Sequence, residues 1–278
     1  MKIALVQVTS SNDPAENLRV VEGFIREAHA GGAEFVLTPE TTNIISCSRK
    51  QQAEVLHTEA DDPTLARLRD LARELKIWVL IGSLGLKTGD ADERFANRSF
   101  LISPDGGIAA RYDKIHMFDV DLGNGEVYRE SSAYRPGVKA TLAKTDIGNI
   151  GMTICYDMRF PDLYRQLAQA GAEILTAPAA FTVPTGRAHW HALLRTRAIE
   201  NGCFVLAPAQ CGTHDWGKEP KRETYGHSLA ISPWGEVLAD GGETQGVTFV
   251  DLDLNDVAKA RAKIPSLTHD REFEPPEA

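Results

Sequence analysis

The stretch Ile150-Gly151-Met152-Thr153-Ile154-Cys155 is an apolar run that ends in a thiol, and the polar Tyr156-Asp157-Met158-Arg159 follows at once. Such a run is typical of a buried strand, and open α/β folds place their chemistry at the carboxyl ends of these strands. Two other apolar runs end in the same way, one at Glu40 and one near Lys114. Carboxylate, ammonium and thiol are the groups needed for covalent acyl transfer without histidine.

This stretch also belongs to an internal repeat. Four segments of the first half recur in the same order in the second half: 2–7 as 150–155, 32–39 as 171–178, 77–81 as 203–207, and 99–106 as 228–235. Four such pairs in register are hard to obtain by chance. They indicate two halves of similar topology, each reading strand–helix–strand–helix–strand–strand, packed into one domain.

The helices between the strands predict how the halves pack. Asp13-Pro14 and Asp62-Pro63 mark helix starts in the first half, and segments 160–170 and 187–201 fill the matching positions in the second. Each helix carries one apolar stripe, so it covers one face of its own sheet and leaves the other face for the opposite sheet. The expected fold is an α/β protein, a four-layer α-β-β-α sandwich.

This domain is expected to span residues 1–253, followed by a tail over residues 254–278. The tail has one short helical segment, 257–263, and then becomes polar and rich in proline. Such a segment has little stability of its own. We expect it to pack on a partner subunit.

Composition excludes several function classes. The chain has 278 residues, of which 42% are hydrophobic and 25% charged, as in globular proteins. Its net charge is −9 and no Lys/Arg cluster is present, which argues against nucleic-acid and membrane partners. No apolar run approaches the ~18 residues of a membrane span. We expect no signal peptide, because no basic segment with an apolar h-region stands before the strand-like residues 3–6. The four cysteines form no CxxC pair, which favours reduced thiols and a cytoplasmic location: Cys47, Cys155, Cys203 and Cys211.

The three groups at the strand ends can be given chemical roles. A free thiol is only a few per cent thiolate at neutral pH, so Cys155 needs a base or a cation beside it. None of the histidines forms a known pattern with a cysteine. Glu40, which follows Pro39 at a strand end, is the better base, and Lys114 is the natural cation. Lys114 and the backbone N–H of Tyr156 would stabilise the oxyanion.

Each of these residues alone is more often structural. A cysteine in a strand is commonly a small core residue, a glutamate commonly lies at the surface, and a lysine is commonly solvated. The functional interpretation therefore depends on the three residues acting together, in the order Glu40, Lys114, Cys155.

The order of these three residues and the sequences that flank them resemble the nitrilase (carbon–nitrogen hydrolase) superfamily, and in particular the Nit-type amidases. The similarity covers nearly the whole chain. The stretches that carry it are 38–40, 112–119, 155–161, 188–201, 225–228 and 233–235. The resemblance implies an α-β-β-α sandwich, a Glu-Lys-Cys triad, and dimers or larger assemblies in which the C-terminal tails reach across.

The resemblance also implies a second glutamate that positions the lysine and the substrate. Glu130 fits best, and Glu126 is the alternative. In the implied mechanism Glu40 takes the proton of Cys155 as the thiol attacks the carboxamide, a thioester forms, and Glu40 then activates water. No metal or organic cofactor is required.

The implied reaction is hydrolysis of a small linear carboxamide to carboxylate and ammonia. The implied substrates are monoamides of dicarboxylic or α-keto acids, including deaminated glutathione and ω-amides. Arg159 and Arg187 are candidates to bind a substrate carboxylate, because each follows a strand end, and Phe181 is a further candidate substrate contact. Three alternatives remain: a nitrilase with the same triad, an N-carbamoyl amide hydrolase, and a non-catalytic scaffold.

Overall fold

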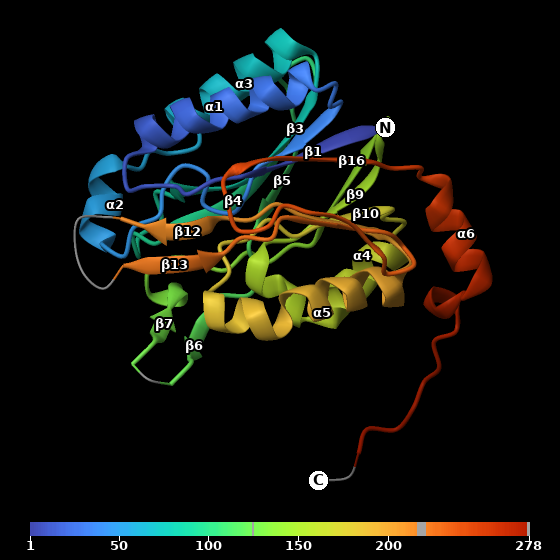
Figure 1. Ribbon diagram of the computed structural model, residues 1–278. Helices are drawn as coiled ribbons and strands as arrows, with labels where there is room; N and C mark the ends of the chain where they lie inside the picture. Colours follow the sequence, from blue (N-terminus) through green and yellow to red (C-terminus); the bar gives the residue numbers. More distant parts are fainter. Residues whose placement is uncertain (124, 216–220, 277–278) are drawn as a thin grey trace.

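The computed structural model describes residues 1–123, 125–215 and 221–276. Two six-stranded sheets form its centre (Figure 1). In the first sheet, three strands are parallel and three are antiparallel to their neighbours. Its strand order is β16 (Gly246–Asp251), β1 (Lys2–Gln7), β2 (Phe35–Leu37), β3 (Trp78–Lys87), β4 (Phe95–Ile102) and β5 (Ile108–Asp113).

The second sheet repeats the first. β9, β10 and β11 are parallel, and antiparallel strands flank them on both sides. The strand order is β8 (Thr141–Thr145), β9 (Gly148–Met152), β10 (Ile174–Thr176), β11 (Phe204–Ala207), β14 (Leu229–Ile231) and β15 (Val237–Asp240). The two halves expected from the sequence are therefore present.

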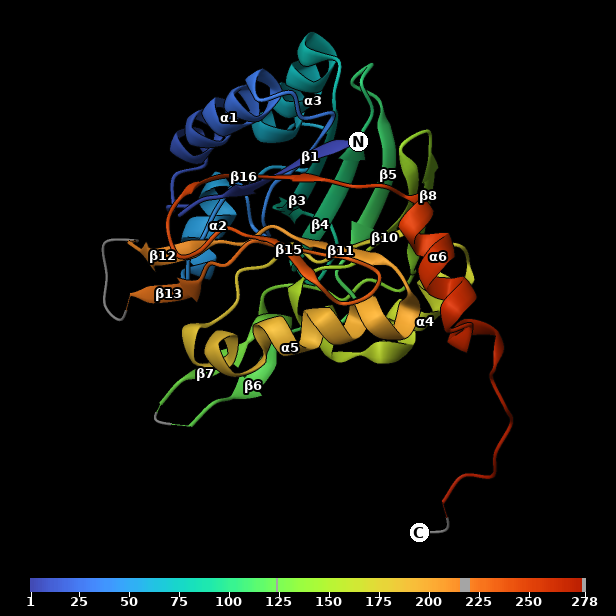
Figure 2. The ribbon, with the colours of Figure 1, turned by 45° about the vertical axis from the view of Figure 1, so that its right-hand side comes forward.

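Helices cover the outer face of each sheet, as Figure 2 shows. α1 (Pro14–Ala30) and α3 (Pro63–Leu75) lie on the first sheet, and α4 (Pro161–Gln169) and α5 (Val183–Asn201) lie on the second. Along β1, Ala4 and Val6 pack with the helices, whereas Ile3 and Leu5 belong to the core shared with the second sheet. This alternation follows from the two-residue period of a strand. The α-β-β-α sandwich is confirmed.

The helix boundaries follow local signals. The Asp13 side chain accepts hydrogen bonds from the N–H groups of Ala15 and Glu16 at the start of α1, and Asp62 caps α3 in the same way. α5 begins at Val183 rather than at Arg187, because Pro184 occupies its first turn, where a proline needs no N–H donor.

Each half also passes its last strand to the other half's sheet. β8 follows the first half in the chain but pairs with β9, and β16 follows the second half but pairs with β1. Nothing in the sequence pattern pointed to this exchange. Main-chain hydrogen bonds within the first sheet therefore join the two ends of the chain, from β1 to β16.

Further elements interrupt the repeated framework. They are the helix α2 (Arg49–Val55), the hairpin β6 (Asp119–Asp121) and β7 (Val127–Arg129), the 3-10 helices η1 (Glu130–Ser132) and η2 (Cys155–Arg159), and the hairpin β12 (Cys211–His214) and β13 (Arg222–Tyr225). These elements lie at one end of the sandwich (Figure 1).

The tail begins against its own chain. α6 (Asn255–Lys263) buries Val257 and Ala260, and Arg261 donates a 2.6 Å hydrogen bond to the Ala172 carbonyl. η3 (Ser266–Thr268) follows, and the last described residues extend away from the body (Figures 1 and 2). Asp270 still bonds to Arg165 and Gln169 of α4. A partner contact therefore stays an expectation for residues 271–276, while 277 and 278 lie outside the described residues.

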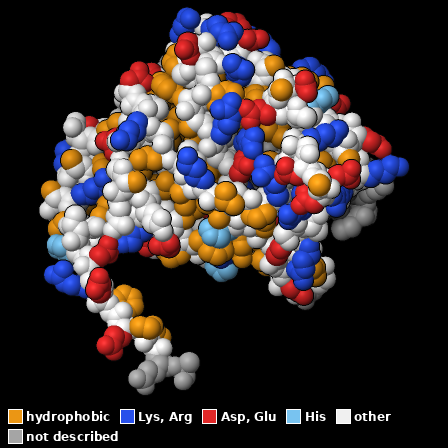
Figure 3. All heavy atoms as spheres, turned by 180° about the vertical axis from the view of Figure 1, so that it is seen from behind, with side chains coloured by type: hydrophobic (Ala, Val, Ile, Leu, Met, Phe, Trp, Pro, Cys, Tyr) orange, Lys and Arg blue, Asp and Glu red, His pale blue; other side chains and the backbone are white. Residues whose placement is uncertain are grey.

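The surface carries both signs of charge. Seen from behind, Lys/Arg and Asp/Glu side chains are interspersed rather than gathered into a basic patch (Figure 3). Among the described residues, no helix has both the length and the apolar character needed to cross a membrane.

Candidate active site

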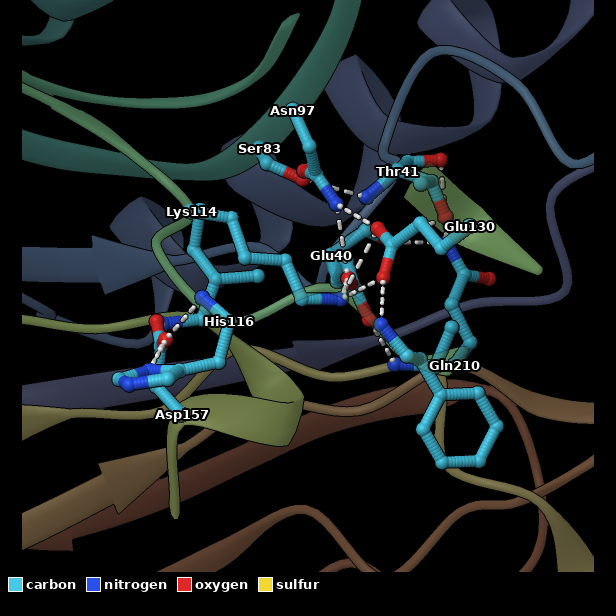
Figure 4. A network of polar contacts seen from close by, with 12 residues as sticks. Glu40, Thr41, Ser83, Asn97, Lys114, His116, Glu130, Asp157 and Gln210 are labelled. Carbon is cyan, nitrogen blue, oxygen red and sulfur yellow. Dashed lines mark hydrogen bonds and ion pairs between the residues drawn. The ribbon is translucent and has the colours of Figure 1, made fainter. Parts of the chain in front are cut away.

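Lys114 is the centre of a buried polar network (Figure 4). It follows β5 directly and is 2% exposed. Its Nζ donates hydrogen bonds to Glu40 Oε1 at 2.8 Å and to Glu130 Oε2 at 2.8 Å. Of the two candidate second glutamates, Glu130 therefore contacts the lysine, whereas Glu126 is exposed at the turn between β6 and β7.

Glu40 is held in place from several sides. Its Oε1 also accepts from Asn97 Nδ2 at 2.9 Å, and its Oε2 accepts from the Ala180 N–H at 2.9 Å. Gly82 lets β3 approach the segment before Glu40, because a Cβ at that position would lie 2.0 Å from the Thr38 carbonyl oxygen. The carboxylate is 4% exposed and fully engaged, so its position is well defined.

Cys155 begins η2 three residues after the end of β9 and is 7% exposed. Its φ of 48° lies in the left-handed region, which is uncommon for a residue other than glycine. Its N–H donates to the Pro178 carbonyl at 2.9 Å. Strained backbone of this kind persists only where the surroundings hold it, and it gathers at functional sites.

Asp157 supplies that support. The fully buried carboxylate accepts hydrogen bonds from Ile154 N–H at 2.8 Å, Tyr112 Oη at 2.7 Å and His116 N–H at 3.0 Å. Tyr112 and His116 flank Lys114 in sequence. Asp157 therefore fixes the turn that carries the thiol against the segment that carries the ammonium.

The three groups shift one another's pKa values. Burial by itself would raise the pKa of Glu40, but the charge and hydrogen bond of Lys114 hold it below its usual value. Burial opposes the charge on Lys114, yet Glu130 and Glu40 raise the pKa of the ammonium well above its usual range. Burial and the adjacent Glu40 carboxylate raise the pKa of the Cys155 thiol, and Lys114 acts in the opposite direction.

The resting state that follows is a neutral thiol beside an ionised carboxylate and a protonated amine. A neutral thiol must lose its proton during attack, and an ionised carboxylate is the acceptor it needs. A protonated amine in a buried site can stabilise a developing oxyanion.

All three residues line one cavity with a volume of about 370 Å³. Glu130, Asn97 and Phe181 also line it, and Arg222 contributes a further cation. Arg159 and Arg187 are not among the lining residues. The Arg159 guanidinium instead lies 5.6 Å from the centre of the Phe181 ring and bonds to His189, and Arg187 is exposed.

Tyr156 directly follows the thiol in η2, and its ring packs edge-on against Phe118 and Phe160. An oxyanion role for its backbone N–H stays a prediction.

Three supporting residues were not predicted: Asn97, Asp157 and Ala180. Asn97 is a polar residue inside the apolar β4 stretch, which was an available signal. Asp157 lies two residues after the thiol, but its sequence neighbours give no sign that its carboxylate accepts bonds from Tyr112 and His116. Ala180 acts through its main chain, which leaves no mark in a sequence.

Three side chains outside the cavity are close enough together to hold a metal ion. Among the described residues, His191, His227 and Asp240 place donor atoms within 4.8 Å of one another. Their side chains bond to each other, with His227 Nδ1 at 2.9 Å from Asp240 Oδ1 and His191 Nε2 at 3.1 Å from Oδ2. None of the three lines the cavity.

Comparison with known proteins agrees with this geometry. The chain is 38% identical over 273 residues to a deaminated glutathione amidase of Yersinia enterocolitica, which covers 97% of this chain and 92% of that protein. The structure of the C. elegans NitFhit protein matches with a TM-score of 0.90 and 37% identity, over 97% of this chain and 65% of that one.

A third match concerns the cysteine. A glutamate-to-glutamine variant of the amidase from Nesterenkonia sp. AN1, carrying acrylamide added at its active-site cysteine, has a TM-score of 0.77 and 26% identity, over 95% of this chain and 98% of that one. The model of the carbon–nitrogen hydrolase family matches residues 2–262. The resemblance seen in the sequence is thereby confirmed, and the chain belongs to the carbon–nitrogen hydrolase family.

Proposed function

We propose that this protein is a cysteine-dependent amidase that hydrolyses small linear carboxamides through a thioester. The observation that carries the proposal is the buried triangle in which Lys114 Nζ lies 2.8 Å from Glu40 and from Glu130, in the cavity that Cys155 also lines. The relatives named deaminated glutathione amidase support an amide of that type as substrate.

In the proposed reaction Glu40 takes the thiol proton while Cys155 Sγ bonds to the carboxamide carbon. Lys114 and the Tyr156 N–H stabilise the oxyanion. Glu40 then gives the proton to the leaving nitrogen, the C–N bond breaks, and ammonia or an amine departs. Glu40 next takes a proton from water, whose oxygen attacks the thioester, and the carboxylate and the thiol are released. Glu130 positions Lys114 throughout.

A release assay tests the proposal. Purified protein is incubated with succinamate, glutaramate, deaminated glutathione, the corresponding nitriles and an N-carbamoyl amino acid, and free ammonia, amine and carbon dioxide are measured. Hydrolysis of the carboxamides with nitriles inert is expected. Turnover of nitriles alone would identify a nitrilase, and release of carbon dioxide would identify an N-carbamoyl hydrolase. If no substrate is turned over and no cysteine is alkylated unusually fast at neutral pH, the protein would be a non-catalytic scaffold.

We also propose that the protein forms homodimers or larger assemblies. Several large apolar side chains are exposed in the single chain: Ile199 (53%), Trp234 (50%), Ile264 (58%) and Phe273 (87%). Asp270 pairs with Arg165 of α4, and the described residues beyond it extend away from the body (Figure 2). Such exposure favours a protein partner. Analytical ultracentrifugation of the full chain and of a chain ending at residue 268 tests this, because a monomeric full chain would contradict it.

A cytoplasmic location is part of the proposal. It is supported by the four cysteines, which are all unpaired, since thiols stay reduced in that compartment.

A further inference from the structure

Two histidines and an aspartate from three different elements meet on the second half of the molecule, outside the catalytic cavity. His191 belongs to α5, His227 stands two residues before β14, and Asp240 ends β15. β14 and β15 are antiparallel neighbours, with Leu229 opposite Asp240, and α5 covers the sheet to which both strands belong (Figure 1). The fold therefore brings a helix and a strand pair together at one point through these three side chains.

The spacing of the donor atoms fits a metal ion. Asp240 Oδ2 lies 3.1 Å from His191 Nε2 and 3.1 Å from His227 Nδ1, and donor atoms of all three residues fall within 4.8 Å of one another. Zinc binds imidazole nitrogen and carboxylate oxygen at about 2.0–2.2 Å, which places neighbouring ligand atoms about 3.3–3.6 Å apart in a tetrahedral site. Side-chain shifts of roughly 1 Å or less would therefore admit the ion.

The surrounding main chain and rings hold these side chains in position. His227 has a left-handed φ of 55°, its N–H donates to the Gly242 carbonyl at 2.6 Å, and its carbonyl accepts from Trp190 Nε1 at 2.8 Å. Its ring stacks on that of Tyr225, with 4.5 Å between the ring centroids. Asp240 Oδ1 accepts from the Gly242 N–H at 2.9 Å. Ligands that are already oriented lose little freedom when an ion binds.

The charges around the three side chains favour a cation. In the described part of the chain no Lys or Arg forms an ion pair with Asp240, whose charged partners are the two histidines. Glu243 Oε1 lies 3.9 Å from Nε2, the other ring nitrogen of His227. A carboxylate on that side favours a proton on Nε2, which leaves the lone pair of Nδ1 for a metal.

The types of ligand select the class of ion. Two imidazoles and one carboxylate are a ligand set of Zn²⁺ and related transition metals, whereas Ca²⁺ and Mg²⁺ take oxygen ligands. Three protein ligands leave a fourth position open. The side chains of His191, His227 and Asp240 are 37%, 20% and 34% exposed, so that an ion can enter from solvent and exchange.

We propose that His191, His227 and Asp240 form a surface site for a divalent transition metal of the Zn²⁺ class. The bound ion links α5 to β14 and β15, so it makes the folded protein harder to unfold. The site is separate from the proposed amidase chemistry, because none of its three ligands lines the catalytic cavity.

Zinc titration of the full chain tests the proposal. The purified protein is freed of metal with a chelator, its accessible thiols are blocked with iodoacetamide because thiolates also bind zinc, and ZnSO₄ is added in a calorimeter. The wild type should bind one equivalent at this site. His191→Gln and Asp240→Asn each remove one ligand and should weaken the binding by at least about 100-fold, since changing a residue that only supports a ligand already costs about 10- to 100-fold.

His189→Gln is the matched control. It makes the same change on the same helix at an exposed histidine two residues earlier, which points to another face and bonds to Arg159. Zinc affinity in this variant should equal that of the wild type. An excess of Mg²⁺ should not compete with zinc in either protein.

Two further measurements report on the surroundings of the ion. Co²⁺ in place of Zn²⁺ should give the visible d–d bands of a nitrogen and oxygen site, without a thiolate charge-transfer band, and Asp240→Asn should lose them. Excess Zn²⁺ should raise the Tm of the wild type and of His189→Gln but not that of His191→Gln. Circular dichroism confirms that each variant keeps the fold.

Two results would overturn the proposal. If the wild type binds no zinc, the three side chains form a structural contact made only of hydrogen bonds. If binding survives both His191→Gln and Asp240→Asn, the ion lies elsewhere on the protein. Neither result depends on whether the protein hydrolyses an amide, so the site and the proposed function are decided separately.

Discussion

The two halves of the molecule share a framework and differ in chemistry. Each presents parallel strands and lends its last strand to the other sheet. In the repeat, Cys155 follows β9 where Gln7 ends β1, and Glu40 follows β2 where Ala179 follows β10. The nucleophile Cys155 in the second half therefore corresponds to a structural glutamine in the first. The base Glu40 in the first half corresponds to an alanine in the second.

Gln7 shows what the equivalent position does when it carries no chemistry. Its Nε2 donates to the carbonyls of Gly242 at 2.9 Å and Thr244 at 2.8 Å, and its Oε1 accepts from Ser228 Oγ at 2.8 Å. These bonds join β1 to the segments around β14 and β15. The fold fixes the position of this strand end in both halves. The side chain found there determines whether the position forms structural hydrogen bonds, as Gln7 does, or carries the nucleophile, as Cys155 does.

The connections differ as much as the strand ends. Between β5 and β8, residues 114–140 contain Lys114, the β6–β7 hairpin and Glu130, whereas residues 241–245 make the equivalent connection from β15 to β16. The α2 region and the β12–β13 hairpin are further departures from the repeat, and both supply lining residues. The repeated part builds the scaffold and carries Glu40 and Cys155, and the unrepeated part adds Lys114, Glu130 and other lining residues of the cavity.

The largest effect is expected at the thiol. Cys155→Ala removes the proposed nucleophile and should lower kcat by at least about 10⁴-fold, as removal of a nucleophile does in other covalent hydrolases. The fold should persist, because alanine fits the space and the left-handed turn is held by Asp157. Steady-state kinetics and circular dichroism check both points, and full activity in this variant would remove the central role assigned to Cys155.

A smaller but still large effect is expected at the base. Glu40→Gln keeps the shape and the hydrogen bond from Ala180 but cannot take a proton, so kcat should fall by about 10²- to 10⁴-fold. Mass spectrometry of the protein with substrate should show either no acyl adduct or one that is not hydrolysed. An adduct that forms and turns over at the wild-type rate would exclude Glu40 as the base.

Lys114→Met should act on stability as well as on activity. It leaves two carboxyl groups without their cation, which costs about 3–5 kcal/mol when one partner of a buried pair is removed. Urea denaturation measures the loss, and Lys144→Met, at an exposed lysine of β8, is the matched control. Equal stability of the two variants would contradict the network.

The same variant should reverse the pH response of Glu40. In the wild type its lowered pKa contributes stability that is lost as the pH falls through the folded-state value. Without Lys114, burial raises the pKa, and the contribution is instead lost as the pH rises. The Lys114→Met variant should therefore gain stability relative to the wild type as the pH falls from neutral into the mildly acidic range.

The smallest effect is expected at Gln7. Gln7→Leu removes the bonds to Ser228, Gly242 and Thr244 and should lower the free energy of unfolding by about 1–3 kcal/mol, with kcat nearly unchanged. Gln166→Leu, at an exposed position of α4, should change neither. A large fall in kcat under conditions where the Gln7→Leu variant is still fully folded would show that the two strand ends are coupled.

Much of the framework could be predicted because its signals are local. The repeat, the Asp-Pro helix starts and the apolar stripes give the strands, the helices and the layers. The pairing of β16 with β1 could not be predicted, because these strands lie at opposite ends of the chain and a strand's own residues do not encode a long-range partner. α2 and the hairpins lack repeated counterparts, so nothing in the other half drew attention to them.

The candidate site divides in the same way. Glu40, Lys114 and Cys155 stand out because each ends an apolar run. Glu130 could not be separated from Glu126 by sequence, because both lie in one connection, and only the fold brings one of them to Lys114. Arg222 carried no signal, because only the fold places β13 beside the cavity.

By itself, the sequence determined the two-fold framework and the reactive groups at its strand ends, because side-chain chemistry and periodicity are properties of neighbouring residues. The tertiary structure alone decided which glutamate holds the lysine, how the main chain of Ala180 holds the base, and why the thiol stays neutral. Those properties depend on burial and on distances between segments far apart in the chain, and both exist only once the sheets have packed.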